Sequence, residues 1–483
     1  MKVTVVGGGT AGYISALILK TRYPHYDISI IKSDKIGTIG VGEGTTEQWK
    51  GFIDVVGIDY KDLIRECDAT MKGALMFENW GKHDYAHSVD RLDEFVFGQE
   101  KVGYLGLILG NKDNKFTINP QNIINGKLEV DNLNNSSVFQ YHFNSEKLNI
   151  FFDKLAKERG IKVIIDEITE VEVNEKGISK IIGSKLQSYV SDFYIDSTGF
   201  KGLLIKKLGA KWVSYSKYLK MNEAIAFPTG DTDEYPLYTL SRAMDYGWLW
   251  RTPTYGRWGN GYIFDNNYIN AEQAQKEVEK YLGHKVDVAR SIKFNPGKID
   301  KTWIKNCVAV GLSASFVEPL EATAISTSIQ QIFLLTNYLS NYTEYDIIDY
   351  NKNIDSIMDN IRDFICLHYI TKKNDTEFWK SLKDIDIPQS LSEKLRRWET
   401  RLPVVEDFND STYHIFKDAN YIQVLNGLNL LNYDELEKRW LSFSEEQRNN
   451  FTRDIQNFLI KERSGEFFTH KKYLETIRGN NYD

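Results

Sequence analysis

A glycine-rich loop near the N-terminus has the residue types and the spacing to hold a phosphate group. Lys2 to Val6 is apolar and β-branched, and Tyr13 to Thr21 has apolar residues at helical spacing. The loop between them reads Gly7, Gly8, Gly9, Thr10, Ala11 and Gly12. In such a strand-turn-helix unit, Gly7 permits the tight turn, Gly9 lets the backbone approach a pyrophosphate and Gly12 allows close helix packing. We therefore predict dinucleotide binding rather than an incidental glycine turn.

The next predicted strand favours a flavin over a nicotinamide cofactor. The segment Asp27 to Ile31 ends in Lys32-Ser33, where a dinucleotide fold usually places an acid for the ribose hydroxyls. No second GxGxxG opens another strand-helix unit in the sequence. Tyr194 to Phe200 is an apolar strand that runs into a glycine turn, as flavoprotein hydroxylases show. Together these features predict that the chain binds FAD. The electrons that reduce FAD would then not come from a nicotinamide-binding domain of this chain.

Two tryptophans could build an aromatic wall. Trp248 and Trp250 are two residues apart on a segment that the sequence predicts to be extended, so both indoles point to one face. We expect Pro253 to end this strand. An isolated pair of this kind is more often two core aromatics, but its neighbours in the sequence favour a functional role.

Several segments resemble the flavin-dependent tryptophan halogenase family, and the match covers most of the chain. Trp248 to Pro253 is similar to the family's W-x-W-x-I-P signature, with Thr252 in place of the isoleucine. The other similar segments, in family order, are Gly40 to Thr45, Thr70 to Ala74, Phe77 to Trp80, Asp196 to Leu204, Gly311 to Ile325, Arg362 to Ile365, Phe378-Trp379 and Asn420 to Leu428. The chain is identified as a divergent member. The resemblance implies halogenation of an electron-rich aromatic carbon with reduced FAD, O2 and a halide.

The resemblance assigns two catalytic residues. Lys72 would hold hypohalous acid, the diffusible oxidant of this chemistry, by a hydrogen bond or as a haloamine and steer it to one substrate carbon. The alternative for Lys72 is a solvated lysine on a strand. Glu321 matches the carboxylate that polarises the halogen donor and takes the ring proton. Glu318, which precedes Pro319, competes for this role and is expected to be the surface member of the pair.

By the same resemblance, the backbone amides of Thr323 and Ala324 form the halide site. Ala324 stands where a glycine is usual, and Ala322 stands where a serine is usual. The flavin contacts carried over from the family, besides the glycine loop, are Ser33, Gly44, Ile168, Leu312 and Ile325. A separate flavin reductase would supply the reduced FAD. The indoles of Trp248 and Trp250 become a partition between flavin chemistry and substrate chemistry.

Two aromatic positions point to the substrate. His87 matches a histidine of the family's substrate chamber, and a metal-binding pair of His83 and His87 is the weaker alternative, because no third ligand is evident. Phe416 occupies the place of a stacking tryptophan that could sandwich a planar ring. Within the segment Pro403 to Tyr413, valines and Ser411 stand where the family has the tyrosines and the glutamate that hold an amino-acid head group. We therefore expect an indole, a phenol or another small electron-rich aromatic to react better than free tryptophan.

Two alternatives share part of this pattern. A flavin-dependent aromatic hydroxylase has the same FAD fold, but its organic substrate must touch the flavin, and an indole wall would block that contact. A non-catalytic FAD-binding protein needs neither Lys72 nor Glu321. The occurrence of both residues in family order favours the halogenase.

The elements that position these residues follow from length and periodicity. A chain of 483 residues is too long for one hydrophobic core. We predict an α/β fold of the flavoprotein monooxygenase type, with an FAD-binding module and an inserted substrate-facing sheet over residues 1–335 and a mostly helical substrate cap over residues 336–483. Apolar residues at helical spacing predict one packed face in the cap. These residues are Ile347, Ile348, Ile354, Ile357, Met358, Ile361, Phe364, Ile365 and His368.

Composition excludes several other functions. A net charge of −7 and a pI near 5.8 argue against nucleic-acid binding. No segment is apolar enough over roughly 18 residues to cross a membrane. Cys67, Cys307 and Cys366 indicate neither a disulfide framework nor a metal site, and they fit a reducing, cytoplasmic compartment. The pattern leaves room for a homo-oligomer.

Overall fold

The computed structural model describes residues 1–35, 43–88, 105, 108–109, 126–129, 140–408, 411, 413–461 and 467–479. By their contacts, these residues form two compact units, each assembled from three stretches of chain. Unit 1 comprises Met1–Ala69, Phe143–Ser216 and Phe294–Asp359, and unit 2 comprises Thr70–His142, Lys217–Lys293 and Asn360–Asp483. The inserted sheet thus groups with C-terminal helices, and the division after residue 335 stays a prediction.

Unit 1 is built on a six-stranded sheet with the order β21-β22-β13-β1-β2-β9. The pairs among the last five strands are parallel, and β21 pairs antiparallel with β22. The strands are β1 Lys2–Val6, β2 Asp27–Lys32, β9 Lys162–Ile165, β13 Phe193–Asp196, β21 Trp303–Ile304 and β22 Cys307–Ala309. The chain proceeds from β1 towards β9 and then reverses to β13 on the other side of β1. Sheets of this kind bind ligands at such a switch point, beyond the carboxyl ends of the strands.

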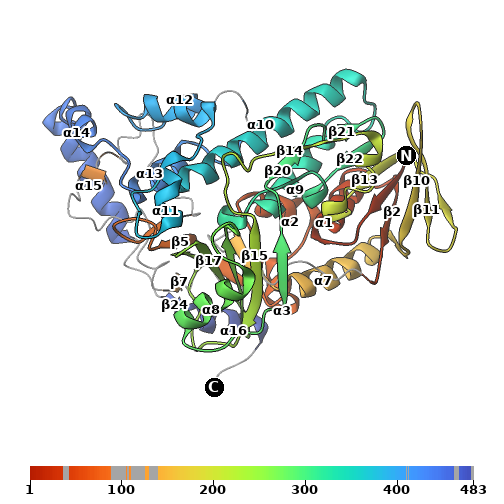
Figure 1. Cartoon of the computed structure of the whole chain (residues 1–483), viewed down its shortest axis with the longest axis horizontal. Helices are drawn as coiled ribbons and strands as arrows, with labels where there is room; N and C mark the ends of the chain where they lie inside the picture. The colour runs from red at the N-terminus through yellow and green to blue at the C-terminus, as the bar shows by residue number, and fades with distance from the viewer. Residues whose placement is uncertain are drawn as a thin grey trace. The chain divides into compact units, whose positions relative to one another are not determined.

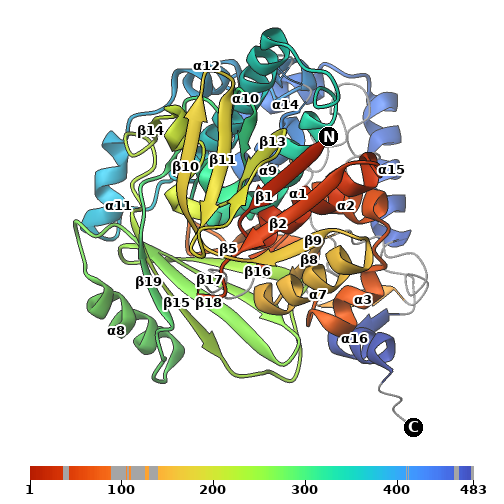
Figure 2. The ribbon, with the colours of Figure 1, turned by 90° about the vertical axis from the view of Figure 1, so that its right-hand side faces the viewer.

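Helices and a small antiparallel sheet cover the sheet of unit 1. Helix α1, Thr10–Arg22, contacts α2, Gln48–Val56, α7, Ser145–Glu158, and α9, Thr323–Leu335. The small sheet consists of β10 Ile168–Asn174, β11 Gly177–Gly183 and β12 Ser188–Tyr189. Its residues Ile178 and Ile181 share an apolar core with Val6, Ile31 and Tyr194 of the large sheet. Figure 2 shows the hairpin of β10 and β11 in yellow near the red strands β1 and β2.

Unit 2 contains a seven-stranded sheet with the order β19-β15-β18-β17-β16-β5-β6. Neighbouring strands are antiparallel except for β5 and β16, which are parallel. The strands are β5 Ala74–Glu78, β6 Tyr85–Ser88, β15 Glu223–Thr229, β16 Tyr238–Met244, β17 Gly247–Thr254, β18 Arg257–Phe264 and β19 Arg290–Lys293. Helix α8, Ala271–Leu282, covers one face through Ala274 and Val278, which pack with Leu249 and Tyr262 (Figure 2).

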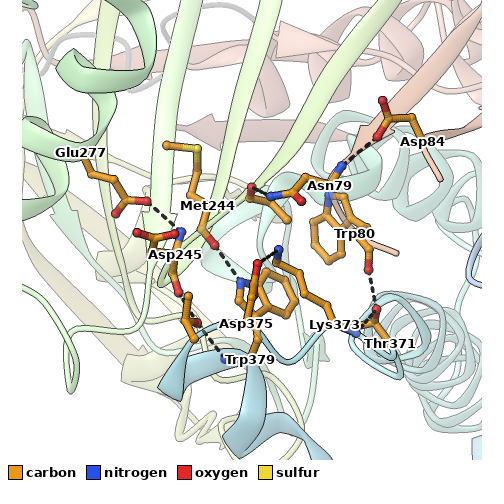
Figure 3. A network of polar contacts seen from close by, with 12 residues as sticks. Asn79, Trp80, Asp84, Met244, Asp245, Glu277, Thr371, Lys373, Asp375 and Trp379 are labelled. Carbon is orange, nitrogen blue, oxygen red and sulfur yellow. Dashed lines mark hydrogen bonds and ion pairs between the residues drawn. The ribbon is translucent and has the colours of Figure 1, made fainter. Parts of the chain in front are cut away.

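The C-terminal helices cover the opposite face of this sheet. His368, the last residue of α10 (Glu344–His368), lies 4.9 Å from the Phe77 ring, and α13, Asp418–Gly427, contacts β6. Figure 3 shows the hydrogen bonds that join α11 (Glu377–Ser381) and the segment before it to Met244, the last residue of β16, and to Trp80, which follows β5. Trp379 Nε1 donates to the carbonyl of Met244 at 2.7 Å, and the Thr371 hydroxyl donates to the carbonyl of Trp80.

The packed face predicted for the cap is confirmed from Ile354 to His368, where the residues named for it are buried. Ile348 is the exception, because it is 64% exposed. One helical residue turns by about 100°, so Ile348 lies off the stripe that Ile354 and Ile361 define. Further elements named below or in Figure 1 are β4 Thr70–Lys72, β7 Lys127–Glu129, β8 Gln140–Phe143, β14 Trp212–Ser214, β20 Gly297–Ile299, β24 Phe467–Thr469, α3 Tyr60–Glu66, α12 Gln389–Arg397, α14 Tyr433–Leu441, α15 Glu445–Lys461 and α16 His470–Arg478. Across the described part of the chain, no helix combines the length and the apolar character needed to span a membrane.

Candidate active site

The glycine loop follows the carboxyl end of β1 and leads into α1, as predicted. A Cβ at Gly12 would lie 2.1 Å from the carbonyl oxygen of Gly7, and a Cβ at Gly7, whose φ is +119°, would lie 2.1 Å from the carbonyl oxygen of Ser197. A Cβ at Gly9, the N-cap of α1, would meet nothing within 4 Å. Gly7 and Gly12 are thus needed for the turn itself, and Gly9 leaves open space before the first amides of α1. This cradle fits the pyrophosphate of FAD.

Other predicted flavin contacts follow neighbouring strands of the same sheet. Ser33 comes directly after β2, Ile168 begins β10 three residues after β9 ends, and Leu312 lies in the 3-10 turn Gly311–Ser313 after β22. Because the carboxyl ends of parallel strands meet at one edge, the structure brings these residues to the edge that carries the glycine loop. Gly44 lies in β3, Glu43–Gly44, and Ile325 lies in α9. The preceding Gly40 to Gly42 fall outside the described residues.

Lys32 stands where an acid was expected, and its contacts explain its presence. Its Nζ lies 2.8 Å from Oδ1 of Asp153, and its side chain lies where a Cβ on Gly8 would be. Burial would raise the pKa of Asp153, but hydrogen bonds from Lys157, Lys32 and Tyr13 lower it to about 2. The end of β2 therefore presents a lysine–aspartate pair instead of a lone carboxylate.

Asp196 organises the loops at this edge, a role that the sequence did not reveal. Its Oδ1 accepts hydrogen bonds from the Thr198 amide at 3.0 Å and from the Ser313 hydroxyl at 3.1 Å. Its Oδ2 accepts from the amides of Leu204 and Ile205 at 2.8 and 2.9 Å. The buried carboxylate thus joins the turn after β13 to the turn after β22. An apolar strand ending in a glycine turn was the available signal, but Ser313 lies too far away in sequence to be paired with it.

Glu321 and the predicted halide amides lie at the start of α9. Glu321 ends the 3-10 turn Pro319–Glu321, Ala322 has a left-handed φ of 55°, and Thr323 opens the helix. The first amides of a helix have no partner within it, so those of Thr323 and Ala324 suit an anion. Glu318 and Glu321 are each 1% exposed. The expectation that Glu318 is a surface residue is wrong, because Pro319 begins a turn that keeps both carboxylates inside.

Lys72 lies in unit 2, on β4. It is 0% exposed and pairs across the sheet with Gln140 of β8. The alternative of a solvated lysine is therefore excluded. Thr70, two residues earlier on the same face, has His142 as its cross-strand neighbour. Burial and then the charge of Lys72 hold the pKa of His142 well below its usual range.

His142 and Thr70 connect β8 and β4 to two strands of the seven-stranded sheet of unit 2. Nδ1 of His142 lies 3.1 Å from the hydroxyl of Thr70, and its Nε2 lies 2.7 Å from the hydroxyl of Thr239 on β16. The Thr70 hydroxyl donates to the carbonyl of Pro253 on β17 at 2.7 Å. None of these contacts could be predicted from the sequence, because nothing local in the sequence links the segments that carry Thr70, His142 and Thr239.

Trp248 and Trp250 lie on β17 and face the same side, as predicted. Their ring centroids are 6.2 Å apart, and Trp248 is fully buried. The cross-strand neighbour of Trp250 is Gly261, where a Cβ would lie 1.9 Å from the indole Cη2. Leu249 points to the other face, into the core with α8. Gly261 thus provides the space that the Trp250 indole fills.

Pro253 does not end β17, which continues to Thr254. The pairing of β17 with β16 stops at Arg251, so Pro253 lies beyond that ladder. A proline is tolerated at such an edge position because no ladder hydrogen bond on that side needs its missing N–H. Its carbonyl instead accepts the hydrogen bond from Thr70.

The structure brings His87 and Phe416 together with a third ring. Phe416 stacks on Phe364 with centroids 4.0 Å apart, and His87 lies 5.4 Å from Phe364 and 6.4 Å from Phe416. His87 Nε2 is also 3.0 Å from the side-chain amide of Asn420. One face of Phe416 is therefore covered by Phe364. His83 lies in an exposed turn, and the described residues contain no group of three or more His, Cys, Asp or Glu that could hold a metal ion.

In the segment that would hold an amino-acid head group, the described residues include a buried carboxylate, Asp407. It accepts hydrogen bonds from both terminal nitrogens of Arg401 at 2.6 and 2.8 Å, from Trp398 Nε1 at 2.8 Å and from the Val404 amide at 3.1 Å. Burial would raise the pKa of Asp407, but these bonds lower it to about 2. Its acceptor positions are engaged within the protein.

Comparison with known proteins extends the likeness over nearly the whole chain. The tryptophan halogenase family matches residues 2–439. Tryptophan 6-halogenase SttH of Streptomyces toxytricini is 30% identical over 472 residues, which cover 88% of this chain and 89% of that protein. The structure of a tryptophan halogenase from Shewanella frigidimarina NCIMB 400 matches with a TM-score of 0.88, 25% identity and coverage of 99% and 98%. Tar14, a flavin-dependent tryptophan C-6 halogenase from taromycin biosynthesis, matches with a TM-score of 0.86, 27% identity and 99% coverage of both chains.

Proposed function

Because the chain belongs to the tryptophan halogenase family of flavin-dependent oxidoreductases, we propose that it halogenates an indole- or phenol-like aromatic through Lys72 and Glu321. The family uses FAD, O2 and a halide. The observation that carries the proposal is the complete burial of Lys72 on β4. Removing an ammonium from water is costly, and a cation kept in such a place is more readily explained by chemistry than by stability.

The proposed reaction divides into oxidant supply and aromatic substitution. Reduced FAD, when bound, would supply two electrons and the halide the other two, so that O2 gives one molecule of hypohalous acid and one of water. Lys72 hydrogen-bonds the oxygen of hypohalous acid and so makes the halogen more electrophilic. The ring carbon forms a bond to the halogen as the oxygen–halogen bond breaks, and the hydroxide leaves as water with a proton from the Lys72 ammonium. Glu321 takes the proton from the ring carbon.

The remaining predicted residues serve binding and separation in this proposal. The glycine loop, Ser33, Gly44, Ile168, Leu312 and Ile325 bind FAD. The amides of Thr323 and Ala324 bind the halide at the start of α9. Trp248 and Trp250 keep the aromatic substrate away from the flavin. A separate flavin reductase delivers the reduced cofactor, since the sequence contains one GxGxxG loop.

The substrate is proposed to lack an amino-acid head group. His87, Phe364 and Phe416 form a small aromatic cluster suited to a planar ring. Asp407 is already occupied by Arg401 and Trp398, so it offers no free carboxylate to a substrate ammonium. The names of the relatives reported above give tryptophan as their substrate. For this chain, competition between tryptophan and indole should nevertheless give more halogenated indole. Equal or better turnover of free tryptophan would refute this substrate class.

The activity is tested by incubating the protein with FAD, a flavin reductase, NADH and chloride, bromide or iodide in turn, against a panel of indoles and phenols. Mass spectrometry should show product whose mass shift follows the halide. A hydroxylated product in halide-free buffer would contradict halogenation and indicate an aromatic hydroxylase. FAD binding without any product from the panel would contradict the proposed substrate class.

A further inference from the structure

The hydrogen bonds around His142 define where its proton lies. The Thr70 hydroxyl has one proton, and it donates that proton to the carbonyl of Pro253 at 2.7 Å. Towards Nδ1 of His142, 3.1 Å away, the hydroxyl can therefore only accept, so Nδ1 carries a hydrogen. In a neutral imidazole Nε2 then has a lone pair, which accepts from the Thr239 hydroxyl at 2.7 Å. Each of these three hydrogen bonds, from Thr239 to His142, from His142 to Thr70 and from Thr70 to the Pro253 carbonyl, thus has one donor and one acceptor.

The charges around His142 favour the same neutral form. The groups whose charge lowers the pKa of His142, besides its burial, are Lys72 on β4 and His470 at the start of α16, and neither is an anion. His470 Nε2 accepts from the Met71 amide at 2.9 Å, and its Nδ1 lies 3.2 Å from the carbonyl of Tyr235, so it too is neutral. Burial lowers the pKa of His470 to about 4. Both histidines of this cluster are thus neutral.

We propose that His142 is a positioning residue for Lys72, acting as a neutral imidazole with its proton on Nδ1. His142 joins β4 to β16 through its hydrogen bonds to Thr70 and Thr239. Thr70 in turn donates to the carbonyl of Pro253 on β17, the strand of Trp248 and Trp250. This assignment rests on the steering role proposed for Lys72 and adds that His142 holds Lys72 in position. Misplacing a catalytic group by about 1 Å can cost roughly 100-fold in rate.

Two substitutions of His142 separate position from bulk. His142→Asn keeps a donor near the place of Nδ1, towards Thr70, whereas His142→Leu keeps the volume and removes both hydrogen bonds. Because a displaced Lys72 would meet hypohalous acid in poorer geometry, kcat should fall about tenfold or more in His142→Leu and be largely restored in His142→Asn. With a soluble trap for hypohalous acid in the assay, the ratio of halogenated product to trapped hypohalous acid (the product-to-trap ratio) should fall in parallel. The KM for the aromatic and the FAD affinity should stay unchanged. Thr254→Val is the control, since it removes a buried hydroxyl from β17 that bonds to Arg257 at 2.9 Å.

Nitrogen-15 NMR of histidine in the full-length FAD-bound enzyme tests the protonation state directly. The His142 signals, assigned by their loss in His142→Asn, should show a protonated Nδ1 and an unprotonated Nε2 from pH 5.5 to 8.5. A proton on Nε2, or a titration within this range, would overturn the proposal. If His142→Leu fails to fold, the isosteric Thr239→Val carries the test, and a product-to-trap ratio equal to that of Thr254→Val would overturn it.

Failure of this inference differs from failure of the proposed function. If Lys72→Ala retains halogenation, the steering role is wrong whatever His142 does. If Lys72→Ala loses halogenation while His142→Leu keeps the normal product-to-trap ratio, the steering role stands and the positioning role of His142 is wrong.

Discussion

The proposed flavin-binding edge of unit 1 is built mainly from backbone, whereas the surroundings of Lys72 in unit 2 are built mainly from side chains. At the flavin edge the backbone matters, because Gly7 and Gly12 leave no room for a Cβ and Gly9 keeps the helix amides accessible. Around Lys72 the side chains matter, because His142 and Thr70 join strands that are remote in sequence. A backbone site tolerates changes of side chain elsewhere, whereas a side-chain network depends on each of its members.

The largest effect is expected from filling the backbone cradle. In Gly12→Ala the new Cβ would meet the Gly7 carbonyl at 2.1 Å, so the loop must shift from its pyrophosphate-binding form. We expect FAD affinity to fall by about 100-fold, which corresponds to about 2.7 kcal/mol, as measured by flavin fluorescence titration. Gly51→Ala in α2 is the matched control, because a Cβ there meets nothing within 4 Å. Equal FAD affinity in both variants would show that the cradle does not hold the cofactor.

A smaller effect is expected from filling the space behind the indole wall. The Cβ of Gly261→Ala would lie 1.9 Å from Trp250 and must displace it. Overpacking of this kind costs about 1–3 kcal/mol in unfolding free energy and should lower halogenated product without loss of FAD affinity. Gly230→Ala, where a Cβ meets nothing within 4 Å, should change neither quantity. Unchanged product in Gly261→Ala would argue that Trp250 is only a core residue.

The smallest effect concerns the pH dependence of the Lys72 surroundings. The pKa of His470 is lowered to about 4, so between about pH 6.5 and 4 the unfolded chain binds a proton that the folded chain does not. Stability is therefore complete above this range and falls as the pH drops through it, by about 0.8 kcal/mol between pH 7.5 and 6. His470→Gln should flatten this slope in urea unfolding, whereas His284→Gln, at an exposed site, should not. Identical slopes in wild type and His470→Gln would contradict a buried neutral His470.

The same contrast explains how much the sequence could predict. The glycine loop was predictable because its strand, turn and helix are consecutive, and each glycine has a backbone reason. Lys72 was identified by its resemblance to a family segment, but its partners were not. Thr70, His142 and Thr239 become neighbours only when β4, β8 and β16 are paired, and one sequence gives no strand pairing.

The errors have the same origin. Pro253 was expected to stop a strand, yet a proline is harmless beyond the last residue that β16 pairs with, and the position of that residue is set by tertiary structure. Glu318 was expected at the surface because it precedes Pro319, and Ile348 on the packed face because it is apolar and close to the helical spacing of that face. Their burial depends on the turn at Pro319 and on the face that α10 presents, which residue type alone does not specify.

The most direct test of the central claim is Lys72→Ala, compared with the wild type in the presence of FAD, a flavin reductase, NADH, bromide and an indole, with a soluble trap for hypohalous acid. We expect both proteins to bind FAD equally and to deliver trapped oxidant. The variant should lose brominated indole by roughly 100-fold or more, because a positioned proton donor contributes about that much. Regioselective bromination at the wild-type rate in Lys72→Ala would contradict the account.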